Sequence, residues 1–395
     1  MIDPLRLNQG NQRLAGWLET AAALAKGFAA RAAQHDHDRS FPLENFAELH
    51  AAGFHLLSIP TEYGGWGATL HEAVQVVEQL AQGDGPTALV YDMHVHVLGA
   101  LAESRPWPEE HFAAVCAELV ERGGWINSCA TEPELGSPSR GGLPKTRAVW
   151  DGDGWRITGQ KSFTSGSPIL THMLIPAVIE DGTAGTVGVF LVRADRPGLR
   201  IEDTWDVMGM RTTASNDLLL ENVPVAHADL VLRRVPDAPD PGRFSGGAWF
   251  GLTVSGVYLG IAEAARDEAI RFAQERRPTA LNGQAIATLP PIQQLTGALE
   301  AELLTARALL YAVTSGWTEQ PAQRPSLSPY VGLCKAIATS HAVKAADLAL
   351  RVVGGQSMSR ALPLERLFRD VRAGLFHPPT EEFAYTNLGK TLLEV

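Results

Sequence analysis

The sequence predicts a mainly helical protein with a central β domain, and three observations lead to this prediction. Apolar residues within 1–123 recur with the 3.6-residue period of amphipathic helices. Residues 124–236 form short β-like runs, and residues 237–395 return to long helical patterns. Two or three domains are expected for a chain of 395 residues, and these changes of pattern divide it into three.

The first region carries amphipathic helices. In residues 14–34, one stripe contains most of the large apolar side chains, namely Leu14, Trp17, Leu18, Ala21, Leu24, Ala25 and Phe28. The segment 42–54 repeats the pattern and reaches Gly53, which suits the C-terminal end of a helix. A glycine-rich loop and another amphipathic helix follow within 59–82.

The middle region reads as a small all-β domain. Its segment 146–163, TRAVWDGDGWRITGQKSF, alternates apolar and polar residues around Asp-Gly-Asp-Gly, which predicts a β-hairpin. Four further β-like runs are expected at 171–180, 185–194, 199–205 and 216–225.

The last region predicts long helices over 255–277, 290–317 and 329–355, and the second and third are long enough to form a bundle. The proline-rich segment 320–329, QPAQRPSLSP, is expected to link two of them.

Composition narrows the function. The net charge of −11 argues against a nucleic-acid partner. Three distant cysteines and the histidine spacing indicate neither a metal site nor a disulfide framework, so we expect a reduced, cytoplasmic setting. The N-terminus has no apolar signal core, and no run reaches the roughly 18 apolar residues that span a bilayer, so no membrane partner is expected.

Two stretches in the middle region carry candidate chemistry. Gly136 and Ser137 lie in a predicted loop whose backbone N–H groups and hydroxyl suit a phosphate, although an ordinary loop is the alternative. In GQKSFTSGSP (159–168), Phe163 would stack on a flat heteroaromatic ring and Ser165 would hydrogen bond to its edge. The alternative for Phe163 is a core position.

These stretches belong to five segments that resemble, in order, motifs of the acyl-CoA dehydrogenase superfamily of flavoenzymes. The segments are 59–67 (IPTEYGGWG), 130–137 (ATEPELGS), 157–166 (ITGQKSFTSG), 205–225 (WDVMGMRTTASNDLLLENVPV) and 354–372 (GGQSMSRALPLERLFRDVR). The resemblance covers most of the chain. It implies a helical N-terminal domain (1–123), a β-barrel middle domain (124–236) and a C-terminal four-helix bundle (237–395).

The resemblance also implies a flavin site. FAD is the expected cofactor, with FMN as the alternative, and the protein would be a homotetramer built on its C-terminal helices. The implied cofactor-binding residues are Thr131, Phe163 and Ser165 at the isoalloxazine, Gly136 and Ser137 at the pyrophosphate, Arg276 reaching a neighbouring subunit's flavin, Gly354 and Gly355 near the adenine, and Thr380.

The match fails at the catalytic base. The family's usual glutamate and the following glycine correspond to Pro378 and Pro379, and only Thr380 of that motif is kept. Some relatives place the base on the first helix of the last domain, but the matching stretch 246–256, GGAWFGLTVSG, contains no acid.

Two residues become the candidate catalytic groups. His377 is the titratable side chain nearest the vacant position, and its ordinary pKa of about 6.5 suits a general base. The alternative is a structural histidine. Asp92 belongs to a helix that lines the pocket in the family, and Glu381 and Glu382 lie about one turn beyond His377.

Other departures point to a second branch. Arg351 replaces the family's glutamine before the glycine pair, and the Phe-Gly after Arg276 is missing. The shorter KSFTSG stretch and the His377-Pro378 pair resemble the flavin monooxygenase branch of the superfamily.

Three functions therefore stay open. The default is α,β-dehydrogenation of an acyl-CoA thioester with a non-standard base, with an electron-transfer flavoprotein as partner. The second is a monooxygenase that takes reduced flavin from a flavin reductase and acts on an aromatic or heteroatom substrate. The third is a flavin-binding member without catalysis.

Overall fold

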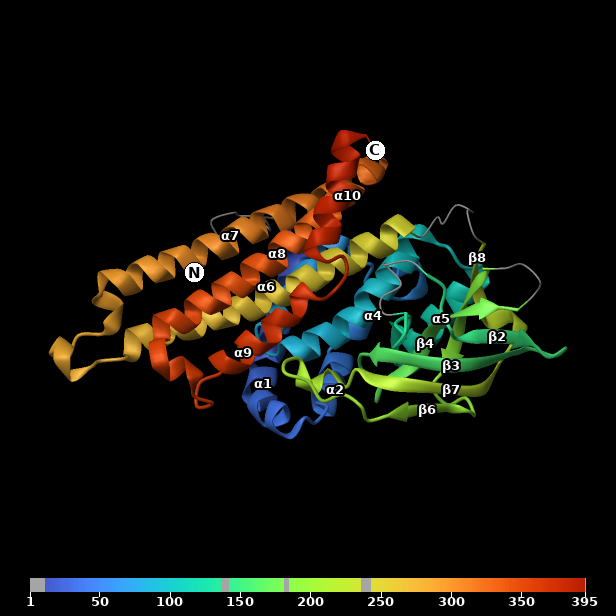
Figure 1. Ribbon diagram of the computed structural model, residues 1–395, viewed down its shortest axis with the longest axis horizontal. Coiled ribbons are helices and arrows are strands. Elements are labelled where there is room, and N and C mark those ends of the chain that lie inside the picture. Colours follow the sequence, from blue (N-terminus) through green and yellow to red (C-terminus); the bar gives the residue numbers. More distant parts are fainter. Residues whose placement is uncertain (1–10, 136–141, 181–184, 236–242, 395) are drawn as a thin grey trace.

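The computed structural model describes residues 11–135, 142–180, 185–235 and 243–394. Figure 1 shows a strand-rich domain on one side and a set of long helices on the other. Five helices come first along the chain, then a sheet, then five helices; the first five are α1 (Gln12–Asp38), α2 (Leu43–Ala51), α3 (Leu70–Ala81), α4 (Gly85–Ser104) and α5 (Glu109–Arg122).

The first helices begin and end where their sequence directs. The predicted stripe of α1 is confirmed, since Leu14, Ala21 and Phe28 are buried. Helix α2 ends just before Gly53, whose φ of 81° is the left-handed conformation that glycine favours. Thr69 and Glu72 form a reciprocal capping box that starts α3.

Helix α4 is the central helix of the fold. The Asp84 side chain caps its N-terminus, and nearly every residue from Gly85 to Gly99 is buried. A helix that is buried all round needs partners on all sides, and α4 has α3, α6 and strand β1 as neighbours. It therefore joins the helical part to the sheet (Figure 1).

The predicted β region forms one eight-stranded sheet. Its strands are β1 (Trp125–Ser128), β2 (Arg147–Trp150), β3 (Trp155–Thr164), β4 (Leu170–Ile179), β5 (Val187–Arg193), β6 (Leu199–Glu202), β7 (Asn216–Val225) and β8 (Leu230–Arg234). The order is β6-β7-β3-β2-β4-β5-β8, with β1 parallel to β4. The predicted hairpin is confirmed, since Trp150 pairs with Trp155 across antiparallel β2 and β3.

The C-terminal helices are α6 (Arg243–Glu275), α7 (Pro290–Glu319), α8 (Arg324–Val353), α9 (Leu364–Val371) and α10 (Glu381–Leu393). Helix α8 packs against α6, α7, α9 and α10. Helix α6 is long and apolar enough to cross a membrane by composition, but 89% of its most apolar window is buried inside the protein, as in a core helix.

One expectation about this region is wrong. Residues 320–329 do not form a link throughout, because α8 already begins at Arg324 and contains Pro329. Pro325 lies in the first turn, where backbone N–H groups have no helical partner anyway. Pro329 removes one helical hydrogen bond, and the packing of α8 outweighs that loss.

Candidate functional site

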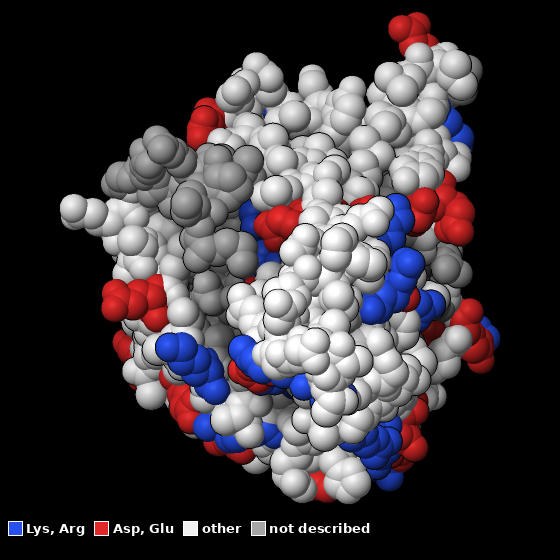
Figure 2. All heavy atoms as spheres, turned by 90° about the vertical axis from the view of Figure 1, so that its left-hand side faces the viewer, with Lys and Arg blue, Asp and Glu red and all other residues white. Residues whose placement is uncertain are grey.

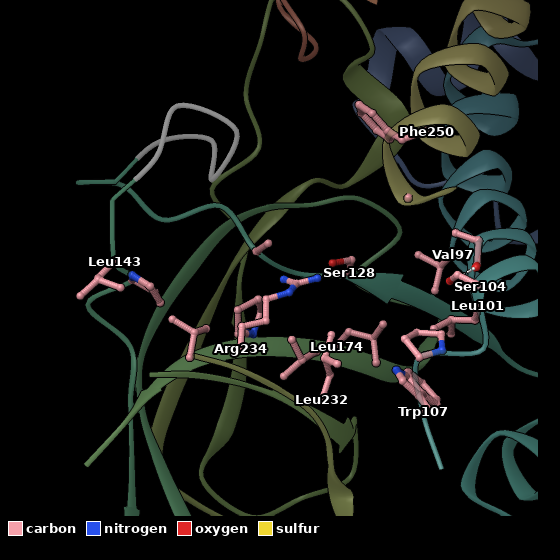
Figure 3. A pocket seen from close by; sticks show the side chains of 18 of the residues that line it. Val97, Leu101, Ser104, Trp107, Ser128, Leu143, Leu174, Leu232, Arg234 and Phe250 are labelled. Carbon is pink, nitrogen blue, oxygen red and sulfur yellow. Dashed lines mark hydrogen bonds between the residues drawn. The ribbon is translucent and has the colours of Figure 1, made fainter. Parts of the chain in front are cut away.

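A cavity of about 540 Å³ lies where α4, the sheet and the start of α6 meet. In Figure 3, Val97 and Leu101 of α4 lie across from Leu174 and Leu232 of the sheet, with Phe250 of α6 above them. A cavity of this size suits a small organic ligand.

The cavity wall is mostly apolar. Its polar side chains among the described residues are His96, Ser104, Ser128 and Arg234. No aspartate or glutamate is among the described lining residues, so no carboxylate there faces a bound ligand.

His96 is the imidazole that lines this cavity. Its Nδ1 donates to the backbone carbonyl of Asp92 at 2.8 Å, which leaves the lone pair on Nε2. Burial lowers the pKa of His96 to about 4, so the ring is neutral at pH 7 and accepts a hydrogen bond through Nε2. Its neighbour His94 differs, because both of its ring nitrogens are occupied by the His55 carbonyl and the Ile126 N–H.

Phe250 separates His96 from His377. The ring centroid of Phe250 lies 5.1 Å from that of His96 and 5.9 Å from that of His377, both edge-on. On its other side, the His377 ring lies 5.7 Å from the ring of Tyr258. His377 thus stands behind Phe250, and the cavity reaches His96 and Phe250 directly. We call His96, Phe250 and His377 the helical wall.

The expectation that His377 titrates near its ordinary value is wrong. Burial, the charge of Lys335 and the nearby His96 lower the pKa of His377 to about 3. The ring is therefore neutral at pH 7 and is a weak proton acceptor. Its role as a catalytic residue stays a prediction, and a hydrogen-bonding role fits a neutral ring better than general-base catalysis does.

Asp92 is placed deeper than the cavity. Its side chain is 0% exposed, and neither carboxyl oxygen has a hydrogen-bond partner among the described residues. The Thr253 hydroxyl beside it donates to the Trp249 carbonyl at 2.7 Å. Burial raises the pKa of Asp92 well above its usual range, which favours the protonated form over the form that acts as a base.

The two predicted flavin segments lie side by side. The Ser162 N–H donates to the Thr131 carbonyl at 2.9 Å, and the Asn127 side chain donates to the Ser165 carbonyl at 3.0 Å. The structure therefore brings Thr131, Phe163 and Ser165 together. We call the segments 127–132 and 162–165 the β wall. Ser128 and Ala130 of this wall line the cavity, whereas Thr131, Phe163 and Ser165 are not among the lining residues.

Phe163 is exposed and has an unusual backbone conformation. Its side chain is 63% exposed, which excludes the core alternative, and its ring meets Trp205 edge-on at 5.5 Å. Its φ of 56° is rare for a side chain of this size and turns the ring outward. Beside it, the Ser165 hydroxyl hydrogen bonds to that of Ser215 at 2.8 Å. An exposed ring next to a buried hydroxyl pair fits a flat flavin ring.

The remaining predicted residues lie elsewhere. Arg276 is exposed just beyond α6, and Gly354 and Gly355 are exposed just beyond α8. In Figure 1 both helices end on the side away from the sheet, and Figure 2 shows that side, with an uncharged central area between charged groups. These positions suit a neighbouring subunit's flavin, which stays a prediction.

Four further positions named from the sequence remain. Thr380 directly precedes α10, and its carbonyl accepts from Ala384. Glu381 is exposed in the first turn of α10, where the Ser340 hydroxyl donates to it at 3.1 Å. Gly136 and Ser137 lie outside the described residues.

Sequence reasoning missed His96 and Phe250. The i, i+4 spacing of Asp92 and His96 places both on one helix face, so the choice of Asp92 contained a signal for His96. Phe250 stands in the stretch 246–256, where the absence of an acid is informative but an aromatic residue carries no separate signal.

Comparison with known proteins agrees with the fold. The chain matches the acyl-CoA dehydrogenase N-terminal domain over 17–104, the middle domain over 127–223 and the C-terminal domain over 252–382. The putative acyl-CoA dehydrogenase YdbM of Bacillus subtilis is 41% identical over 385 residues, which is 97% of this chain and 98% of YdbM.

Two solved structures are similar over nearly the whole chain. KijD3 in complex with FMN and an amino-deoxy sugar nucleotide of dTDP has a TM-score of 0.85 and 25% identity, covering 98% of this chain and 95% of KijD3. The methanesulfinate monooxygenase MsuC of Pseudomonas fluorescens has a TM-score of 0.84 and 25% identity, and the match covers 95% of this chain and 96% of MsuC.

Proposed function

The chain belongs to the acyl-CoA dehydrogenase family of flavin-dependent oxidoreductases, and on this premise we propose that it is a reduced-flavin-dependent monooxygenase. Its substrate is a compact, apolar aromatic or heteroatom compound. A separate flavin reductase supplies the reduced flavin.

One observation carries this proposal: the described residues that line the cavity contain no carboxylate. Acyl-CoA dehydrogenation needs a base to remove the α-proton of the thioester. Neither family position for that base holds an acid here: one is Pro378, and the other lies in the stretch 246–256, which contains no acid. The carboxyl group of Asp92 is buried and favours its protonated form. Monooxygenation does not need this base, so the lining of the cavity supports it.

The residues of the β wall would hold the flavin. Phe163 offers its exposed ring to the flat face, while the Ser165 hydroxyl and the backbone around Thr131 offer hydrogen bonds to the polar edge. When bound and reduced, the flavin supplies the electrons with which molecular oxygen is activated. KijD3 holds FMN, which supports FMN here, whereas the family resemblance implies FAD with FMN as the alternative. Chromatography of the released flavin distinguishes the two.

The residues of the helical wall would act on the substrate. A substrate hydroxyl or amino group would donate to His96 Nε2, which is unprotonated at neutral pH. Phe250 would pack on the substrate and exclude water from the cavity. His377, a neutral ring behind Phe250, would support that side chain from the side away from the cavity.

Acyl-CoA dehydrogenation is the second candidate, and its support is the 41% identity to YdbM, whose name gives that activity as putative. Its base would be Asp92, which must then lose its proton and gain access to the cavity in the complex. An electron-transfer flavoprotein would accept the electrons.

Two parallel assays test the proposal. In the first, oxidised protein loaded with flavin is mixed without oxygen with a panel of acyl-CoA thioesters, and the flavin absorption is followed. In the second, protein, a flavin reductase, NADH and oxygen are incubated with a panel of aromatic and sulfur compounds that includes indole. We expect oxygenated product in the second assay and no bleaching in the first. Bleaching by an acyl-CoA would instead establish the dehydrogenase.

A further inference from the structure

Lys335 of α8 is a buried lysine that forms no ion pair with a described acidic residue. Its side chain is 1% exposed, and its ammonium donates to two backbone carbonyls, those of Gly374 at 2.7 Å and His377 at 2.6 Å. Burying an ammonium group is costly unless its donors are satisfied. Because backbone carbonyls, and no described carboxylate, accept the hydrogen bonds of this ammonium, we expect Lys335 to hold the backbone at those carbonyls in place.

Both carbonyls belong to the segment that carries His377. A short 3-10 helix, Arg372–Leu375, continues α9 and ends just before it. The last carbonyls of a helix lack partners within the helix, and a lysine side chain is one of the groups that satisfy them. Lys335 does so from a different helix, so it ties the 374–377 turn to α8.

The 374–377 turn also packs closely against α6 and α8. A Cβ atom at Gly374 would lie 2.8 Å from ring carbons of Tyr258 and 3.0 Å from Cγ2 of Thr339. Only glycine therefore brings the turn this close to α6 and α8. Lys335 adds the directional contacts that packing alone does not provide.

We propose that Lys335 is a positioning residue, whose two hydrogen bonds fix the 374–377 turn and thereby hold the His377 ring against Phe250 and Tyr258 in the helical wall. The hydrogen-bond distances, the burial of the ammonium and the ring contacts of His377 support this directly. The consequence for turnover rests on the proposed function, whereas the consequence for the turn does not.

The test compares three variants of the flavin-loaded protein. Lys335→Met keeps the length of the side chain and removes both donors, and Lys335→Gln keeps a shorter donor. Thr339→Val is the matched control one turn along α8, because the Thr339 hydroxyl donates to carbonyls of its own helix and its Cγ2 is retained. Hydrogen–deuterium exchange of the peptide 372–383 is measured without substrate, together with flavin content, kcat and KM.

We expect exchange in 372–383 to be at least about tenfold faster in Lys335→Met, intermediate in Lys335→Gln and unchanged in Thr339→Val. We also expect kcat to fall about tenfold in Lys335→Met with KM changed less than twofold, and Lys335→Gln to recover part of kcat. Unchanged exchange in folded Lys335→Met would overturn the proposal, and so would faster exchange with unchanged kcat.

If Lys335→Met does not fold, the same criteria apply to Lys335→Gln. If the unmodified protein oxygenates no compound, the proposed function fails, but the exchange data still decide whether Lys335 fixes the turn.

Discussion

The two walls of the site differ in how closely they follow the family. The β wall keeps the motifs from which a flavin site is expected, and it presents Phe163 to solvent. The helical wall has lost the acid at both base positions and instead holds His96, Phe250 and His377, with Lys335 behind them. This difference supports the proposal that the protein keeps the family's flavin and performs a different reaction with it.

The β wall depends on a buried ion pair, and breaking it should have the largest effect on stability. Lys161 is fully buried and donates to Glu132 at 2.6 Å and to the Pro176 carbonyl at 2.7 Å. Lys161→Met removes the cation paired with Glu132, although the Lys145 N–H and the N–H and hydroxyl of Thr146 still donate to this carboxylate. We therefore expect a loss of about 3 kcal/mol in the free energy of unfolding, the lower end for a broken buried pair. Chemical denaturation measures this.

The double variant Lys161→Met with Glu132→Gln is the control for that experiment, because it removes both charges. It should recover part of the loss. A single variant as stable as the unmodified protein would show that the β wall does not depend on this pair.

The histidines of the helical wall should lower the stability of the protein in mild acid. The pKa of His96 is lowered to about 4 and that of His377 to about 3, mainly by burial. The unfolded chain binds protons at about pH 6.5, so the stability from each neutral ring is present above that pH and is lost as pH falls towards the folded value. Between pH 7 and pH 5, each ring should lower the free energy of unfolding by about 2 kcal/mol.

His96→Gln and His377→Gln test this directly, because each variant removes one titrating group. Unfolding by urea at pH 7, 6 and 5 should show a shallower loss of stability in each variant. The exposed His37 of α1 supplies the control, and His37→Gln should leave the slope unchanged. Parallel slopes in all four proteins would contradict the assignment of neutral buried rings.

Replacing residues of the helical wall should lower kcat. Replacing His96 by alanine should lower kcat by about 10–100-fold, since it is the ring that borders the cavity. His377→Ala should lower kcat by about tenfold while flavin content stays the same, because it removes the ring that positions Phe250 from behind. Glu381→Gln is the control, and it should keep full activity because Glu381 is exposed outside the cavity.

Flavin occupancy should respond to the β wall and not to the helical wall. Phe163→Ala removes an exposed ring, so we expect about tenfold weaker flavin binding and an unchanged melting temperature of the flavin-free protein. Phe383→Ala, also an exposed ring but on α10, should bind flavin normally. Equal affinity in both variants would remove Phe163 from the flavin site.

The contrast also explains what the sequence allowed us to predict. The β wall follows local motifs and turn chemistry, so Phe163 and Ser165 were identified before the structure and are adjacent in it. The helical wall depends on contacts between α4, α6 and the 374–377 turn, which no local pattern encodes. His377 was therefore found by its position, but its lowered pKa was not, because burial is set by Phe250 and Tyr258.

The prolines near the start of α8 also show that local sequence alone does not predict where a helix begins. The segment 320–329 looked like a link because it holds three prolines, yet α8 begins at Arg324 and includes Pro325 and Pro329. Tertiary packing against α6 and α7 decided the outcome, and local propensity did not.

The origin of the oxygen atom in the product tests the central claim most directly. The flavin-loaded protein, a flavin reductase and NADH are supplied with ¹⁸O₂ and the best aromatic or sulfur substrate, and the product mass is measured. The account predicts one ¹⁸O atom per product molecule, and labelled product that forms about 10–100-fold more slowly in His96→Ala at equal flavin content. Product without ¹⁸O, or flavin reduced by an acyl-CoA thioester in the absence of oxygen, would contradict it.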